Sequence, residues 1–228
     1  MGLVSNKKQL GFYLDSRVCI GCKTCIIACK DKNDLPVEVN WRRVIEYCGG
    51  SWNSEKGDLV PSAVFVYYLT VSCQHCASPP CMEVCPSSAI SKSDDGIVHV
   101  DQEVCVRDQS CLYACPYGAP QFGSDTARMS KCDMCADLRA IDKNPACVDA
   151  CPLRALDWGD MAELREKYGN ISAVDPLPDG RITNPSMILT PHRHAQLLSN
   201  GKGHATNLPE SNPEGINTIG RTVIKDNK

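Results

Sequence analysis

Aromatic side chains are scarce in this sequence: 3 Phe, 3 Trp and 7 Tyr among 228 residues make up only 6% of the chain. A chain of this length forms one large domain or two small ones, and such domains normally need a substantial apolar core. Because so little aromatic surface is available for burial, we expect a fold that inorganic cofactors hold together in part.

An excess of basic residues is absent as well. With 24 Lys and Arg against 27 Asp and Glu, the formal net charge is −3. Proteins that bind nucleic acid through its phosphates need a basic surface. The composition therefore argues against a nucleic-acid partner.

Long hydrophobic runs are also lacking. The most apolar stretch, residues 63–71 (AVFVYYLTV), is too short for a membrane-spanning helix, which needs ~20 residues, and is expected to form a buried strand. The first six residues lead directly to Lys7 and Lys8, without the apolar segment of a secretory signal. We therefore expect no direct membrane insertion, and membrane association only through a partner.

Cysteine, in contrast, is abundant: 16 residues, or about 7% of the chain. Short secreted disulfide scaffolds contain ~8–10% cysteine, but this chain is too long for that class. Fifteen of the cysteines fall into four groups that each end in Cys-x3-Cys, and a proline follows each of the last three groups. The groups are Cys19, Cys22, Cys25 and Cys29; Cys73, Cys76, Cys81 and Cys85; Cys105, Cys111 and Cys115; and Cys132, Cys135, Cys147 and Cys151.

This spacing is that of the Cys-x2-Cys-x2-Cys-x3-Cys-Pro run of bacterial ferredoxins, with a wider middle gap in the second and fourth groups. Three thiolates on one tight loop can each hold one iron of a cubane face. The fourth lies one helical turn further on and points to a neighbouring cluster, and the proline ends that conformation. The pattern predicts iron–sulfur clusters.

Disulfides and structural zinc are the alternatives. Closely spaced Cys-x2-Cys pairs rarely bridge one another, which argues against disulfides. Zinc could use the pairs at 19/22, 73/76 and 132/135 as half-sites, but it needs neither a third cysteine three residues later nor the repeated ending. A zinc protein that docks other proteins is the remaining hypothesis from a different functional class.

The segment between the second and third groups predicts a β-hairpin, from residues 89–90, a turn at 94–96 and alternation over 97–100. A hairpin between two cysteine groups is the layout of a two-cluster ferredoxin. We therefore expect an α+β fold of two nested ferredoxin-like modules with an irregular C-terminal extension. Groups two and three form the inserted module, residues 61–118, and groups one and four form the other, residues 1–60 plus 119–159.

The chain changes character after Cys151. Residues 160–168 predict a short amphipathic helix with Asp160 as its N-cap. From Ile171 onward the sequence is rich in proline, glycine and asparagine. We expect residues 160–228 to form this helix and an extended segment that lies on a partner.

Exchange of the fourth cysteine between groups gives four hypothetical ligand sets. The last is one ligand short, and Asp108 stands at the vacant position, since Cys105-x2-Asp108-x2-Cys111 restores the spacing. Asp108 could complete a 4Fe–4S cluster, or the corner could be empty in a 3Fe–4S cluster while Asp108 faces water; an external ligand is a further possibility. The sets are cluster 1, Cys19, Cys22, Cys25 and Cys151; cluster 2, Cys29, Cys132, Cys135 and Cys147; cluster 3, Cys73, Cys76, Cys81 and Cys115; and cluster 4, Cys85, Cys105, Cys111 and Asp108.

Four other side chains invite a functional interpretation. Cys48 belongs to no motif and is expected to be a buried thiol that acts as a small hydrophobic residue. His75 lies between Cys73 and Cys76, but that ligand set is complete, so we expect it near a ligand or exposed. His192 and His194 have no flanking ligands and are expected at the surface.

Several segments resemble those of a known family: GFYLDSRVCIGCKTCIIACKD, WRRVIEYCGGSW, VCPSSAI, ACPYGAPQF and CPLRALDWG. With the cysteine groups, they resemble the four-cluster iron–sulfur electron-transfer (B) subunits of the dimethyl sulfoxide reductase family of molybdopterin oxidoreductases, over about residues 9–192. This implies a subunit of anaerobic respiration that is not itself an enzyme. It would pass single electrons between a quinol-oxidising membrane subunit and a molybdopterin catalytic subunit.

The resemblance also implies the cofactors and the position of the complex. Three 4Fe–4S clusters are expected, with cluster 1 nearest the molybdenum subunit and cluster 4 nearest the point where electrons arrive. At the position of Asp108, several relatives have Cys and a 4Fe–4S cluster, whereas respiratory nitrate reductases have Trp and a 3Fe–4S cluster; Asp108 departs from both. The complex would assemble in the cytoplasm and lie on the periplasmic face of the bacterial membrane after co-export with the catalytic subunit.

The same wire role in polysulfide reductase, formate dehydrogenase or a dehydroxylase is the alternative within the family. The iron–sulfur subunits of formate dehydrogenases carry a C-terminal membrane helix, which residues 160–228 do not contain.

Overall fold

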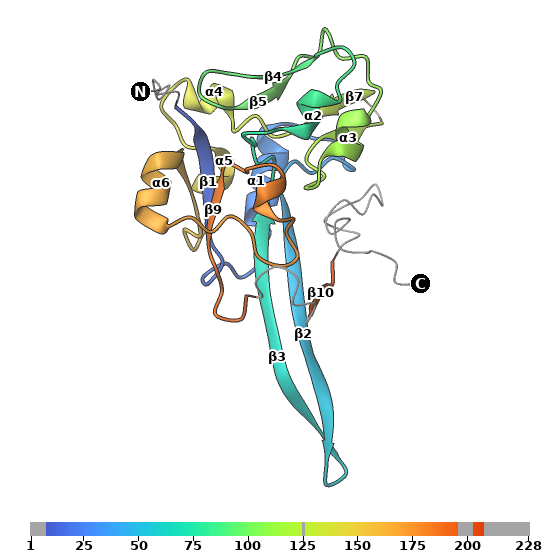
Figure 1. Cartoon of the computed structure of the whole chain (residues 1–228), viewed down its shortest axis with the longest axis vertical. Helices are drawn as coiled ribbons and strands as arrows, with labels where there is room; N and C mark the ends of the chain where they lie inside the picture. The colour runs from blue at the N-terminus through green and yellow to red at the C-terminus, as the bar shows by residue number, and fades with distance from the viewer. Residues whose placement is uncertain (1–7, 125, 196–202, 208–228) are drawn as a thin grey trace.

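The computed structural model describes residues 8–124, 126–195 and 203–207. Small sheets and short helices form a body, and one long hairpin projects from it (Figure 1). This mixture confirms the α+β class. Among the described helices, none is long and apolar enough to cross a membrane.

A three-stranded sheet in the order β8-β1-β9 joins the two ends of the described chain. Its central strand is β1 (Leu10–Asp15), antiparallel to β8 (Leu156–Asp160) and parallel to β9 (Met187–Thr190). The first five residues of β1 are buried, as expected for a strand with neighbours on both edges. The sheet therefore fixes the N-terminal segment against residues far along the chain.

Helix α6 (Met161–Tyr168) follows β8 directly and packs on this sheet through Met161 and Leu164. The Asp160 carboxylate accepts a hydrogen bond from the Ala162 backbone N–H at 2.8 Å. The expected helix and its N-cap are confirmed.

The projecting hairpin consists of β2 (Arg43–Glu55) and β3 (Asp58–Val71), and β10 (Gly203–Ala205) pairs with β2 near the body. Near the body, Phe65, Tyr67 and Leu69 are buried on one face, whereas residues 58–61 are exposed. The strand expected over residues 63–71 is thus longer than expected and buried only in part. The boundary expected between residues 60 and 61 lies inside β3, and the division into nested modules stays a prediction.

The remaining elements are short because they are the turns that follow cysteine loops and the hairpins between them. The hairpin of β4 and β5 lies where the sequence predicts one. These elements are α1 (Thr24–Lys32), α2 (Pro80–Glu83), β4 (Ile90–Lys92), β5 (Val98–Val100), α3 (Ser110–Ala114), β6 (Gln121–Gly123), β7 (Arg128–Ser130), α4 (Ala136–Arg139), α5 (Ala146–Asp149) and the 3-10 turn η1 (Gly180–Ile182).

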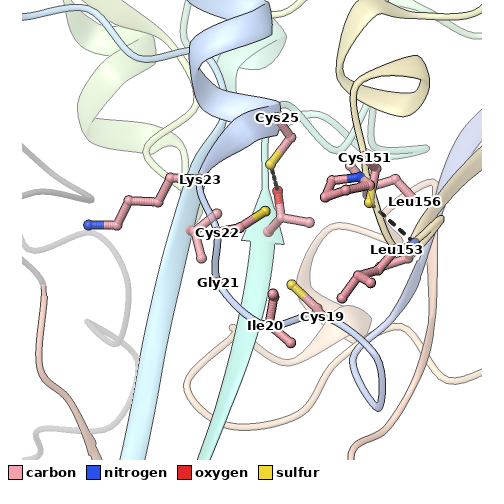
Figure 2. A pocket seen from close by; sticks show the side chains of 13 residues that line it. Cys19, Ile20, Gly21, Cys22, Lys23, Cys25, Cys151, Leu153 and Leu156 are labelled. Carbon is pink, nitrogen blue, oxygen red and sulfur yellow. Dashed lines mark hydrogen bonds between the residues drawn. The ribbon is translucent and has the colours of Figure 1, made fainter.

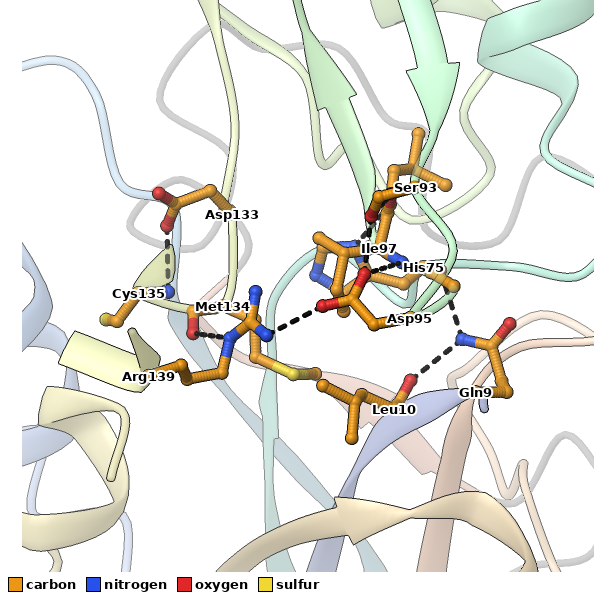
Figure 3. Close-up of polar contacts among 12 residues, drawn as sticks. Gln9, Leu10, His75, Ser93, Asp95, Ile97, Asp133, Met134, Cys135 and Arg139 are labelled. Carbon is orange, nitrogen blue, oxygen red and sulfur yellow. Dashed lines mark hydrogen bonds and ion pairs between the residues drawn. The ribbon is translucent and has the colours of Figure 1, made fainter. Parts of the chain in front are cut away.

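The turn of the β4–β5 hairpin contacts two other parts of the chain (Figure 3). Asp95 forms an ion pair with Arg139 of α4 at 2.7 Å. The Leu10 N–H donates to the Asp95 carbonyl at 2.9 Å, and the Gln9 side chain donates to the Gly96 carbonyl at 3.1 Å. The hairpin is therefore held against both β1 and α4.

Part of the segment after Ile171 packs against the chain itself, because Val174, Leu177 and the strand β9 are buried in its own core. The composition of the segment did not indicate this burial. Its strand β9 pairs with the open edge of β1 in an existing sheet, so the segment needs no core of its own. The contact of the remaining part with a partner stays a prediction. Residues 196–202 and 208–228, which belong to the expected partner-binding segment, lie outside the described residues.

The cap of α6 gives a test of this arrangement. Replacing Asp160 by Ala removes the acceptor for the Ala162 N–H and should destabilise the helix by about 1 kcal/mol. Faster amide hydrogen exchange across α6 would show this, whereas Asp160→Asn, which keeps an acceptor oxygen, should exchange nearly as slowly as the parent. Equal protection in the Ala variant would show that tertiary packing alone holds α6.

Candidate metal centres

The four cysteines of set 1 line one cavity together. Cys19 and Cys22 come from the loop that enters α1, Cys25 comes from the first turn of α1, and Cys151 comes from the turn after α5. Figure 2 shows their sulfur atoms around the space between the loop and the turn. Four thiols arranged around a shared space suit a polynuclear group, whereas zinc would draw four sulfurs to ~2.3 Å from one point.

The tight loop of set 1 depends on Gly21. Its φ is +68°, a conformation in which a side chain is strained. A Cβ atom there would lie 2.3 Å from the Tyr68 ring. The loop therefore lies directly against β3, and only glycine fits.

Polar hydrogens point at the sulfurs of set 1. The Ala155 backbone N–H donates to Cys151 Sγ at 3.3 Å, and the Thr24 hydroxyl donates to Cys22 Sγ at 3.4 Å. Such donors favour the charged thiolate over the thiol. For the exposed Cys22, hydrogen bonds from the side chain and the backbone of Thr24 lower the pKa of the thiol.

Set 2 lies deeper in the body. Its members are all buried, and they come from the end of α1, the loop before α4, and α5: Cys29, Cys132, Cys135 and Cys147. Burial, aided by the nearby charges of Cys147 and Cys135, raises the pKa of the Cys29 thiol to about 12. The Met134 N–H donates to Cys132 Sγ at 3.3 Å.

Set 3 lines a second cavity, formed by Cys73, Cys76, Cys81 and Cys115 together with Lys131. Burial raises the pKa of Cys76 to about 12, and the charges of Cys73 and Cys115 act in the same direction. The Ala119 N–H donates to Cys115 Sγ at 3.4 Å.

Set 4 lies between α2 and α3. Burial raises the pKa of Cys111 to about 12, and the charges of Cys105, Asp108 and Cys85 raise it further. Asp108 is exposed, yet it lies close enough to act on Cys111. The structure thus brings together the four residues of the incomplete set.

The chemistry of these sets fits iron. A thiol with a raised pKa is neutral at physiological pH, and it binds as a thiolate only when a metal replaces its proton. Among the described residues, no three His, Cys, Asp or Glu side chains converge on a position for a single metal ion. Sets 1 and 3 instead surround cavities with sulfur, the donor that iron–sulfur clusters use.

The other singled-out residues lie outside the four sets. Cys48 is in β2, opposite Val66, and is only half-buried rather than buried as expected. His75 is fully buried, and its Nδ1 accepts from the Val98 N–H at 3.1 Å. Burial and nearby cations, Lys131 foremost, lower its pKa well below the usual value. His75 is therefore a buried histidine in its neutral form, which settles the expectation against an exposed position.

The histidines near residue 192 are not isolated surface residues. The His192 ring stacks on Tyr67 with centroids 6.0 Å apart, and the exposed His194 stacks on Phe65 at 6.5 Å. Their contacts explain how residues 191–195 lie along β3.

Sequence reasoning missed three buried cations near the sets: Arg42, Arg43 and Lys131. The sequence did contain a signal for these positions: Arg42 and Arg43 stand at the start of an apolar segment, and Lys131 directly precedes Cys132. Charged side chains are rarely buried without a partner, so each of these positions needs a physical explanation.

The loop glycine of set 1 can be tested directly. Gly21→Ala should displace the Cys19–Cys22 loop and remove about a quarter of the bound iron, if four clusters share the metal. Gly57→Ala is the matched control, because Gly57 also has a positive φ, +91°, but no atom within 4 Å of an added Cβ. The measurement is the iron content per chain, determined colorimetrically after anaerobic purification. Full iron content in Gly21→Ala would show that the loop tolerates displacement.

Comparison with known proteins places this geometry in a family. The model of the 4Fe-4S dicluster domain matches residues 64–161. The B subunit of the anaerobic dimethyl sulfoxide reductase of Escherichia coli (strain K12) is 47% identical over 202 residues, which cover 89% of this chain and 98% of that protein. The corresponding B subunit of Haemophilus influenzae is 46% identical, with 89% and 99% covered. The B subunit of the polysulfide reductase of Wolinella succinogenes is 33% identical, with 84% and 99% covered. With these similarities along most of its length, the chain belongs to the family of iron–sulfur electron-transfer B subunits of dimethyl sulfoxide reductases and related molybdopterin oxidoreductases.

Proposed function

We propose that this chain conducts single electrons along four iron–sulfur clusters and performs no bond chemistry on a substrate. The observation that carries the proposal is the grouping of fifteen cysteines into four sets within one chain. When bound, each cluster supplies a site that accepts and releases one electron. The residues of the chain fix the positions of these sites and set their environment.

The ligand assignment follows the sets. Cys19, Cys22, Cys25 and Cys151 hold cluster 1; Cys29, Cys132, Cys135 and Cys147 hold cluster 2; Cys73, Cys76, Cys81 and Cys115 hold cluster 3; and Cys85, Cys105 and Cys111, with Asp108, hold cluster 4. Clusters 1 to 3 are of the 4Fe–4S type, and cluster 4 is either 4Fe–4S with Asp108 as a ligand or 3Fe–4S.

Shared elements support a linear order of the clusters. Helix α1 carries Cys25 of set 1 and, one turn later, Cys29 of set 2. The charge of Cys73 in set 3 acts on the pKa of Cys132 in set 2, so these sets are neighbours. Set 3 reaches set 4 through α3, which carries Cys111 and ends at Cys115. This gives the order 1, 2, 3, 4.

Exposed apolar side chains beside both ends of this order support a partner at each end. Proteins rarely expose clustered apolar surface without a binding role. Beside set 1, the exposed residues are Val18, Ile20, Ile27 and Leu153; beside set 4, they are Met82, Val84, Val104, Val106 and Tyr113. We infer a molybdopterin catalytic subunit beside cluster 1 and a quinol-oxidising membrane subunit beside cluster 4.

The alternative is the same electron-transfer role in a complex that catalyses a different terminal reaction, such as polysulfide reduction. The similarity to the B subunit of a polysulfide reductase supports keeping this alternative. The substrate is determined by the catalytic partner, so identifying the protein that co-purifies distinguishes the two complexes.

The cluster proposal is tested on anaerobically purified full-length protein. A broad absorption band at about 400 nm and near-equal iron and acid-labile sulfide are expected. Removing one ligand, as in Cys22→Ala, should lower the iron content by about a quarter because four clusters share the metal. The matched variant Cys48→Ala should leave it unchanged. A colourless protein with stoichiometric zinc, or iron loss in Cys48→Ala, would contradict the assignment.

Asp108 determines the type of cluster 4. A carboxylate oxygen is a harder ligand than a thiolate and holds its iron less firmly. Asp108→Cys should therefore convert the site to a stable 4Fe–4S cluster. In electron paramagnetic resonance of the oxidised protein, any 3Fe–4S signal of the parent should disappear in this variant, and a labile iron should become firmly bound. An unchanged spectrum and iron content would show that Asp108 is not at the ligand corner.

A further inference from the structure

Arg42 is a charged side chain in the interior, just before the start of β2. It is only 2% exposed. Its guanidinium lies 4.5 Å from the centroid of the Phe12 ring, and it donates to Thr70 Oγ1 at 3.2 Å and Ser72 Oγ at 3.1 Å. These partners are neutral, and within the described ranges Arg42 has no ion pair with Asp or Glu.

A buried charge without a counter-charge is strongly destabilising. Arginine cannot avoid this cost by becoming neutral, because its guanidinium has a pKa above ~12 and keeps its proton. Burial opposes the charge, but the ionised forms of nearby cysteines outweigh burial and raise the pKa of Arg42. These cysteines carry that charge once a metal replaces their protons, so the counter-charge available to Arg42 is metal-bound sulfur rather than carboxylate.

The cysteines whose charges favour the Arg42 guanidinium belong to two sets: Cys25 to set 1, and Cys147, Cys132 and Cys29 to set 2. The geometry agrees, because Thr70 joins Arg42 to Cys25, and Cys29 of set 2 lies one turn after Cys25 on α1. The guanidinium therefore lies near both proposed clusters.

Thr70 adds a directed contact between Arg42 and set 1. Its hydroxyl oxygen accepts from Arg42 and lies 3.4 Å from Cys25 Sγ. Because the oxygen lone pair faces the guanidinium, the hydroxyl hydrogen is available for the Cys25 thiolate. The positive charge is therefore relayed to a sulfur of set 1 through one polarised O–H group.

We propose that Arg42 is the counter-cation shared by clusters 1 and 2, and that it raises the reduction potentials of both. The proposal rests on the proposed electron-transfer function. Reduction adds one electron, and one negative charge, to a cluster; no bond forms or breaks and no proton moves. A fixed positive charge stabilises the reduced form more than the oxidised form, so it favours reduction of both neighbours together.

Arg43 provides an internal control of the same residue type. It is also buried, at 1% exposure, but it follows Arg42 directly, and successive side chains of an extended chain point to opposite sides. Arg43 donates to the Tyr117 carbonyl, and the thiolate that acts on its pKa is Cys115 of set 3. Removing this second arginine should therefore affect cluster 3 rather than clusters 1 and 2.

The experiment compares Arg42→Gln, Arg42→Lys and Arg43→Gln in the anaerobically purified full-length protein with its co-purifying partners. Potentials are measured by electron paramagnetic resonance during stepwise reduction with dithionite. Cys22→Ala and Cys135→Ala identify the signals of clusters 1 and 2 by their loss. Arg42→Gln should lower the equilibrium constant for reduction of both clusters by about tenfold, or about 59 mV for one electron. Arg42→Lys should retain most of the parent potential, and Arg43→Gln should shift cluster 3 alone.

A second variant separates charge from packing. Thr70→Val keeps the volume but removes the hydroxyl, so it should lower the potential of cluster 1 and leave cluster 2 nearly unchanged. If Arg42→Gln fails to bind clusters 1 and 2 whereas Arg42→Lys binds both, the positive charge is required and the proposal stands. If both variants fail alike, or if Arg42→Gln binds all clusters at the parent potentials, the proposal is wrong. Absence of cluster signals in the parent protein would instead contradict the electron-transfer function itself.

Discussion

The rest of the structure depends on the burial of thiols in place of an ordinary apolar core. Eleven of the sixteen cysteines are buried, and seven of them belong to the largest hydrophobic cluster of the described chain. Burial raises the pKa of most of these thiols, so these buried thiols favour the neutral form until a metal replaces their protons. The short helices and hairpins have few contacts of their own. We therefore regard the metal as part of the folding free energy rather than as an addition to a finished fold.

The same constraint explains why cations lie in the interior of a weakly acidic protein. Clusters with thiolate ligands are anionic, and a low-dielectric interior makes that charge expensive unless opposite charge is nearby. Arg42 lies near sets 1 and 2, and Arg43 and Lys131 lie beside set 3, whereas the carboxylates in ion pairs of the described chain lie at or near the surface. The buried cations thus face sulfur, and the surface cations face carboxylates.

Local spacing explains which features were predictable. The cysteine groups, the β4–β5 hairpin and the cap at Asp160 are encoded within a few residues, and sequence alone identifies them. The position of β9 is not, because a short apolar run after a proline-rich segment becomes a strand only when β1 offers an edge. The buried position of Arg42 likewise depends on residues that are far from it in the chain, such as Thr70 and Ser72, which accept its hydrogen bonds, and Cys147, whose charge acts on its pKa. The half-burial of Cys48 follows from the length of a hairpin that extends beyond the body, which no periodicity in residues 43–71 indicates.

The pairing of β1 with β9 has a consequence for the order in which the molecule forms. Residues 10–15 leave the ribosome among the first and residues 187–190 among the last, yet these segments are adjacent strands. Set 1 also combines early and late residues, because Cys151 is synthesised long after Cys19. All residues of sets 3 and 4, in contrast, lie within residues 73–115. Translation therefore delivers the middle of the chain as a local unit. Strand β8, which follows Cys151 closely, then pairs with one edge of β1, and the other edge stays open until β9 has been made. The four cysteines of set 1 are thus all present before the sheet beside them is complete.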